Sequence, residues 1–134
     1  MFQISAKTDY GLLIMLELAR HTDQVVPLSP LAKRLKVSSP YLSQIANHLQ
    51  KAGLIISREG SGGGYTLARP ASKIEVMSVL EALSGEMKVR CTHSGGACPH
   101  FRDCGLKSAW PILIDDIKLS LSKRTLSSLL KQTI

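Results

Sequence analysis

All three cysteines of the chain fall in one short segment, at Cys91, Cys98 and Cys104. Because their number is odd, these thiols cannot all pair with one another within one chain. Glycine and proline lie between them, and these residues suit a loop folded around a ligand. Most of the nearby charged or ionisable side chains are basic and would help to hold thiolates: Arg90, His93, His100, Arg102 and Lys107.

Three kinds of site are compatible with this segment. Structural zinc sites usually pair cysteines about two to four residues apart, and no such pair occurs here, although His93 or His100 could complete a zinc site. Cysteines that sense oxidation without a metal are a second kind. An iron–sulfur cluster suits three soft thiolates in an open polar loop, but it needs a fourth ligand from elsewhere. The spacing alone does not decide among them.

The composition favours a folded domain with a polyanionic partner. Hydrophobic residues make up 44% of the 134-residue chain, and its formal net charge is +7. This balance suits nucleic acid or an acidic membrane surface. No apolar run reaches the ~20 residues of a membrane-spanning helix, and the first residues lack the pattern of a signal peptide. We therefore expect a cytoplasmic protein in a reducing compartment, outside the membrane.

No set of residues indicates an enzyme. The sequence contains no evident nucleophile–base arrangement, no paired carboxylates in a setting typical of a cleft, and no nucleotide-binding loop. We therefore expect a binding protein.

Hydrophobic spacing and capping residues predict a helix-turn-helix near the N-terminus. A first helix is expected from a cap at Ser5 to a break at 21–23. The pairs at 29–30 and 39–40 are both Ser-Pro, a capping hydroxyl followed by a proline that suits the first turn of a helix. A turn of about four residues between these two helices is typical of a helix-turn-helix. Gly53 follows the second helix, where a left-handed residue is favoured.

The outer face of the helix that begins at Ser39 is rich in groups that can bind base edges. Its hydrogen-bonding side chains include almost no acids: Tyr41, Ser43, Gln44, Asn47, His48 and Lys51. An ordinary solvated helix face has a similar composition, so this face alone does not establish DNA binding.

A β-hairpin is expected directly after this helix. Residues 54–58 and 65–68 have the composition of strands, and the tip between them, 59–64, is rich in glycine. A hairpin in this position is the wing of a winged helix, whose tip can approach a phosphate or enter a minor groove. A nucleotide-binding loop is disfavoured, because no Gly-Lys-Ser/Thr follows and no helix begins there.

Further helices are expected after the wing. Residues 72–75 have the spacing of a capping box before a helix that ends at Gly85. An apolar stripe then extends from Leu106 to Leu121, and Thr125 can cap a last short helix. The winged core offers these last helices no obvious place to pack. We therefore expect the long helix to pair with its copy in a second subunit, with packing back onto its own core as the alternative.

Together these patterns predict a mostly α protein with a small β-hairpin, in which a winged helix-turn-helix precedes a long C-terminal dimerisation helix. The expected regions are a DNA-binding domain at 1–85, a cysteine loop at 86–105, and the dimerisation helix with a C-terminal helix at 106–134.

Nearly the whole chain resembles the winged-helix regulators that include IscR, NsrR and SufR. The resemblance implies a homodimer with a [2Fe-2S] or [4Fe-4S] cluster on the three cysteines, and the residues around Trp110 look most like members that regulate cluster-assembly genes. It rests on several motifs together: Thr8-Asp9-Tyr10-Gly11, Val37-Ser38-Ser39-Pro40-Tyr41-Leu42, Ala52-Gly53-Leu54, Gly63-Gly64-Tyr65, Ala68-Arg69-Pro70, the cysteines and Trp110.

The same resemblance implies the metal ligands. It assigns ligand roles to Cys91, Cys98 and Cys104. IscR-like members place a histidine three residues after the last cysteine, where this chain has Lys107, which cannot ligate while protonated. NsrR-like members use an aspartate from the first helix of the partner subunit, and Asp9 matches it. Asp9 is the expected fourth ligand, although an acid also suits the first turn of a helix for electrostatic reasons.

The expected function is a DNA-binding transcription repressor whose affinity for a near-palindromic operator depends on the cluster. A thiol- or zinc-dependent regulator without a cluster, and a regulator that acts mainly through a protein partner, are the alternatives. Family wings usually carry arginine just before the first tip glycine, where this chain has Glu59. Ser39, Tyr41, Ser43 and Gln44 are expected to meet bases or phosphates, and Lys33, Lys36, Lys51 and Arg58 to contact phosphates.

Overall fold

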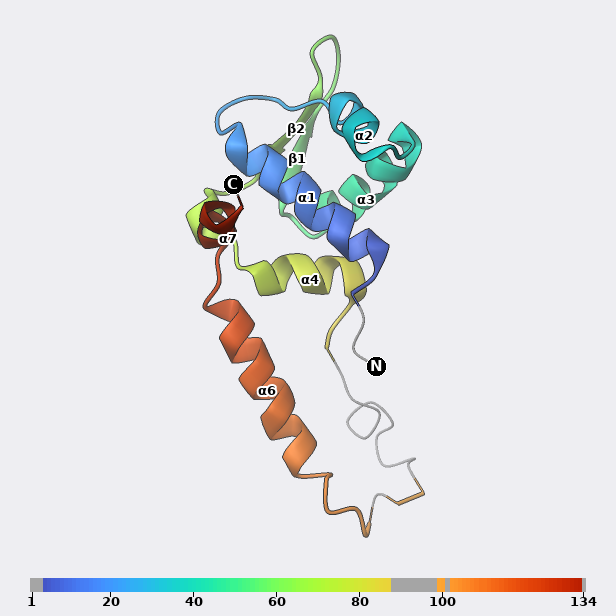
Figure 1. The fold of residues 1–134 in the computed structure, drawn as a ribbon, viewed down its shortest axis with the longest axis vertical. Coiled ribbons are helices and arrows are strands. Elements are labelled where there is room, and N and C mark those ends of the chain that lie inside the picture. The colour runs from blue at the N-terminus through green and yellow to red at the C-terminus, as the bar shows by residue number, and fades with distance from the viewer. Residues whose placement is uncertain (1–3, 88–98, 101, 134) are drawn as a thin grey trace.

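The computed structural model describes residues 4–87, 99–100 and 102–133. Within these ranges the chain forms six α-helices, a short 3₁₀ segment and one two-stranded antiparallel sheet. The predicted fold class, mostly α with a small hairpin, is therefore confirmed. Figure 1 shows most helices gathered around the hairpin, while one helix, α6 (Ala109–Ser122), extends away from them. No helix within the described ranges is long and apolar enough to cross a membrane.

The first helix, α1 (Ala6–Arg20), begins and ends where the sequence predicts. The Ser5 hydroxyl accepts a hydrogen bond from the backbone N–H of Thr8 at 3.2 Å. At the other end His21 leaves the helical conformation, and Asp23 adopts a left-handed backbone with φ of 67°. The helix packs against both the helix-turn-helix and the helix that follows the wing.

The helices α2 (Ser29–Leu35) and α3 (Ser39–Lys51) form the expected helix-turn-helix, but the predicted capping residues are wrong by one position. Ser38 caps α3, because its backbone is extended and its hydroxyl accepts a hydrogen bond from the Tyr41 N–H at 3.2 Å. Ser39 and Ser29 are already the first helical residues, and Leu28 precedes α2 without a side-chain cap.

The wing is the predicted hairpin of β1 (Ile55–Arg58) and β2 (Gly64–Leu67), paired with Arg58 opposite Gly64. The start of β2 is also tied to the segment between α1 and α2, where Val26 and Tyr65 exchange two backbone hydrogen bonds of 2.9 Å. Gly64 permits this close approach, because a Cβ there would overlap the backbone carbonyl of Val26.

After the wing, a short 3₁₀ segment, η1 (Ala71–Lys73), leads into α4 (Val76–Ser84), which ends at Gly85 as predicted. The capping box predicted at 72–75 is wrong: Glu75 precedes α4 and makes no side-chain cap. The first backbone N–H of α4 finds its partner elsewhere in the fold: the Val76 N–H donates to the carbonyl of Arg124 at 2.9 Å.

The last two helices differ in their packing. The helix α7 (Leu126–Gln132) begins with a capping box of Thr125 and Ser128 and returns to the core, where Leu126 is 0% exposed. For α7, the expectation that the last helices find no place on the winged core is therefore wrong. In contrast, α6 contains no buried residue and exposes four large apolar side chains: Ile112, Leu113, Ile117 and Leu119.

Candidate nucleic-acid interface and cysteine segment

The N-terminal half of α3 presents the side chains that we expect to meet DNA. Ser39, Ser43 and Gln44 are exposed. Tyr41 is half-buried, because its ring packs edge-on against Tyr10 of α1 with the ring centroids 5.8 Å apart and an angle of 88° between the planes. Tyr41 therefore also belongs to the contact between α1 and α3. Recognition of bases by these residues stays a prediction.

Exposed basic residues lie at the ends of α2 and α3. Lys33 and Lys36 lie at the end of α2, and Lys51 is the last residue of α3. Lys36 has a left-handed backbone with φ of 57°, and its N–H donates to the Lys33 carbonyl at 3.2 Å, which ends α2. Cations in these positions can contact phosphates and would make binding salt-dependent.

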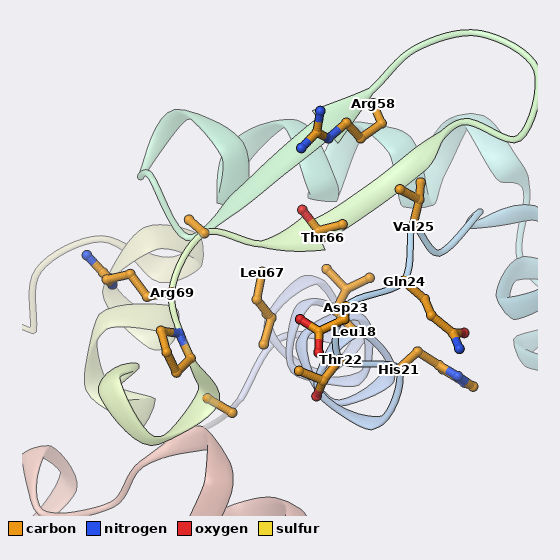
Figure 2. A pocket seen from close by; sticks show the side chains of 13 residues that line it. Leu18, His21, Thr22, Asp23, Gln24, Val25, Arg58, Thr66, Leu67 and Arg69 are labelled. Carbon is orange, nitrogen blue, oxygen red and sulfur yellow. The ribbon is translucent and has the colours of Figure 1, made fainter.

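One hydrogen bond that the sequence did not reveal joins α3 to the wing. Gln50 Nε2 donates to Ser57 Oγ at 3.1 Å. Because adjacent strand residues face opposite sides of a hairpin, Arg58 then projects from the other face. Figure 2 shows Arg58 there, beside a cavity at the base of the wing. The sequence carried no signal for this role of Gln50 beyond a polar side chain on an exposed helix face.

A nearly buried acid holds α2 against α1. The Glu17 side chain is 12% exposed, and its Oε2 accepts a hydrogen bond from Arg34 Nη2 at 2.7 Å. Arg20 and His21 approach the same carboxylate at 3.7 and 3.6 Å. A carboxylate in such a position needs partners of this kind, because burial of an isolated charge is costly. Glu17 therefore fixes the first helix of the helix-turn-helix.

The first turn of α1 contacts the end of α4. The Thr8 hydroxyl oxygen is 2.7 Å from Ser84 Oγ and 2.9 Å from Ser5 Oγ, and Thr8 is 2% exposed. Ser84 is the last residue of α4, directly before the region that leads to the cysteines. Since Tyr10 of the same helix contacts Tyr41, this end of α1 adjoins both α3 and the end of α4, after which the chain leads to the cysteines.

Of the expected cysteine ligands, Cys104 lies among the described residues, whereas Cys91 and Cys98 lie outside them. Cys104 is a half-buried free thiol. Exposed Arg102 and Lys107 are close in sequence, and Lys107 Nζ donates to the Arg102 carbonyl at 3.4 Å. A partly accessible thiol fits the chemistry of a metal ligand.

Asp9, the expected fourth ligand, is exposed in the first turn of α1. Figure 1 places this turn beside the end of α4, whereas the residues before α6 lie at the end of α6 remote from α7. Across the described residues, no three His, Cys, Asp or Glu side chains are grouped to hold a metal ion. The placement of Asp9 against a partner's cysteines therefore stays a prediction.

Comparison with known proteins gives matches along nearly the whole chain. The family model Rrf2, described as an iron-dependent transcriptional regulator, matches residues 4–132. The HTH-type transcriptional regulator IscR of Vibrio atlanticus is 33% identical over 130 residues, which cover 96% of this chain and 75% of that relative.

Two solved structures are similar over most of their length. CymR of B. subtilis, described as the global cysteine regulator, has a TM-score of 0.79 and 29% identity, with 100% of both chains covered. IscR of T. potens has a TM-score of 0.75 and 33% identity, covering 99% of this chain and 89% of that one. The winged-helix architecture is thus shared with regulators of both names.

Proposed function

The chain belongs to the Rrf2 family of iron-dependent transcriptional regulators, and from this premise we propose that it is a homodimeric repressor whose operator affinity is controlled by an iron–sulfur cluster. The family accounts for DNA-binding regulation. The cluster, its ligands and the dimer are our proposal.

The gathering of all the cysteines into one segment carries this proposal. Cys91, Cys98 and Cys104 would hold the cluster as thiolates, the ligands that such clusters prefer. A cluster bound there would supply a centre that is sensitive to oxidation. Cys104 supports the assignment, because it is a half-buried free thiol with basic residues nearby.

For the fourth ligand we propose Asp9 of the partner subunit. The lysine at position 107, already engaged with the Arg102 carbonyl, cannot ligate while protonated. A carboxylate contributed across the dimer would make the ligand set depend on how the two subunits are placed.

The proposed dimer rests on the apolar surface of α6. Ile112, Leu113, Ile117 and Leu119 are 62%, 46%, 42% and 58% exposed, and burial against a second copy would remove this surface from water. Two winged domains joined in this way would present two α3 helices to successive major-groove half-sites, as a near-palindromic operator requires.

The first turn of α1 is the path by which we propose that the cysteine segment influences α3. On one side Thr8 meets Ser84 at the end of α4, through hydroxyl groups 2.7 Å apart. On the other side Tyr10 packs against Tyr41 in the first turn of α3. A shift of this turn would move the start of α3 and disturb its contacts with bases. Each such contact is worth ~1–3 kcal/mol.

The test compares cluster content with DNA binding. We expect anaerobically purified protein to contain iron and acid-labile sulfide, and a variant with Ser at positions 91, 98 and 104 to contain neither. A DNA operator is first selected from random duplexes with the wild-type protein. The affinities of the wild type and the variant for this operator should then differ by at least ten-fold. Equal affinity of the two proteins, or wild-type protein without iron and sulfide, would contradict the proposal.

A second candidate is a regulator that senses oxidation through thiols alone. The structural similarity to the cysteine regulator of B. subtilis favours it. In that case the wild-type protein would lack iron and sulfide, and its operator affinity would still change on treatment with peroxide and recover with a thiol reductant.

A further inference from the structure

We infer that the cavity at the base of the wing binds a small amino dicarboxylate, a molecule with two carboxylates and one ammonium group. The cavity has a volume of about 590 Å³, which is within the size range of small-molecule sites. The end of α1, the loop after it and the wing line this open cavity, as Figure 2 shows. Apart from Arg58, the proposed function uses none of its lining residues.

The cavity combines an apolar lining with a few charged groups, which is the usual composition of a ligand site. Leu18 is 2% exposed and therefore lies at the deep side, together with the half-buried Leu67. Val25 adds apolar surface from the loop after α1. This lining can cover the short carbon chain of a ligand.

Two guanidinium groups supply the positive charge. Arg58 is the last residue of β1, and Arg69 lies two residues beyond the end of β2. Within the described part of the chain, neither side chain has an ion-pair or hydrogen-bond partner. A guanidinium without a partner is suited to hold a carboxylate through two parallel hydrogen bonds.

One carboxylate lies on the facing loop. Asp23 lines the cavity (Figure 2) and forms no ion pair within the residues that the structure places. It follows the C-terminus of α1, whose partial negative charge also favours a cation. His21 lines the cavity too, but its Nε2 is directed to Glu17 at 3.6 Å. Two cations and one anion are complementary to two carboxylates and one ammonium.

The consequence for regulation rests on the proposed function. Arg58 is also an expected phosphate contact, so a ligand that holds its guanidinium would compete with operator DNA. Because such coupling is reciprocal, bound operator DNA would lower the affinity for the ligand by the same factor.

Calorimetry with the full chain and without DNA tests the cavity directly. We expect L-glutamate or L-aspartate to bind at least ten-fold more tightly than succinate, which lacks the ammonium, or L-alanine, which lacks the second carboxylate. Arg69→Ala should weaken L-glutamate by about ten-fold or more, the usual loss for a charged hydrogen bond. Arg124→Ala, an exposed arginine outside the cavity, is the matched control and should bind as the wild type does.

Asp23→Asn separates the ammonium contact from the backbone. Asparagine tolerates the left-handed conformation at this position, so the loop should keep its shape. We expect weaker binding of L-glutamate and unchanged binding of succinate. Wild-type protein that binds neither amino dicarboxylate, or binds succinate equally well, overturns the inference. Neither result would bear on the iron and sulfide content, which tests the proposed function separately.

Discussion

The winged unit, by which we mean residues 5–85 together with α7, and the helix α6 bury their apolar residues to opposite degrees. In the winged unit, Ile14, Leu42 and Leu49 are 0% exposed. In α6, no residue is buried, and Ile112 and Leu119 are 62% and 58% exposed. The winged unit thus buries most of its apolar side chains within one chain, whereas α6 leaves apolar surface exposed for another.

The two regions meet at a small number of places. The helix α6 packs against α4. The Val76 N–H donates to the Arg124 carbonyl at 2.9 Å, which ties the chain just after α6 to the first residue of α4. Lys118 of α6 pairs with Glu86 at 3.6 Å, just beyond the end of α4. The direction in which α6 leaves the winged unit therefore depends on its packing against α4 and on these few polar contacts.

The largest expected effect compares one leucine from each region. Leu126→Ala removes a fully buried side chain of α7 and should lower the free energy of unfolding by about 2–5 kcal/mol. Leu119→Ala removes an exposed side chain of α6 and should cost below about 0.5 kcal/mol in the monomer. Urea unfolding at a protein concentration that favours monomer measures both. Equal losses would contradict the division into a packed and an unpacked region.

The second prediction addresses the surface that α6 leaves open. The double change Ile112→Ser and Leu119→Ser should raise the dimer dissociation constant by about a hundred-fold, because each side chain buried at an interface contributes about 1.5 kcal/mol. Sedimentation equilibrium measures the constant. Ile56→Ser is the control, since Ile56 is an apolar residue of the wing with 47% exposure. If only the control variant dissociated, the wing rather than α6 would hold the dimer.

Local signals in the sequence predicted most of the winged unit. The Ser5 cap, the helix-turn-helix, the wing and the glycines at 53 and 85 all depend on residues close together in the chain. The caps of α2 and α3 were misplaced by one position, and the larger failures are nonlocal. No pattern at 72–75 could show that the carbonyl of Arg124 would serve Val76, and no pattern after Thr125 could show that α7 fits the core.

For the candidate site, too, the sequence predicted local features but not the contacts between distant residues. Polar composition predicted the exposed positions of Ser43 and Gln44, but the contacts that fix α3 and α2 came only from the fold. The bond from Gln50 to Ser57 and the pair of Glu17 with Arg34 join residues 7 and 17 positions apart. The ligand set of the cysteine segment stays a prediction, because Cys91 and Cys98 lie outside the described residues.

The third prediction probes an ion pair within the winged unit. Glu17→Gln should lower the free energy of unfolding by about 1–2 kcal/mol, because the charge-assisted hydrogen bond to Arg34 is lost from a carboxylate that is 12% exposed. Thermal unfolding measures the effect. Arg34→Ala should cost at least as much, because it leaves the Glu17 carboxylate with only Arg20 and His21, at 3.7 and 3.6 Å. A clearly smaller loss in Arg34→Ala would show that Arg20 and His21 satisfy the Glu17 carboxylate without Arg34.

The smallest effect on stability is expected at the contact between α3 and the wing. Gln50→Ala removes a hydrogen bond to Ser57 between exposed or half-exposed groups. The free energy of unfolding should therefore change by less than about 0.5 kcal/mol. Operator affinity should nevertheless fall by about three-fold, because the wing would no longer be fixed relative to α3 when both meet the duplex. Gln132→Ala, at the end of α7, is the matched control and should change neither quantity. An operator affinity in Gln50→Ala equal to that of the wild type would mean that the core contacts of β1 and the backbone bonds between Val26 and Tyr65 hold the wing in place without this bond.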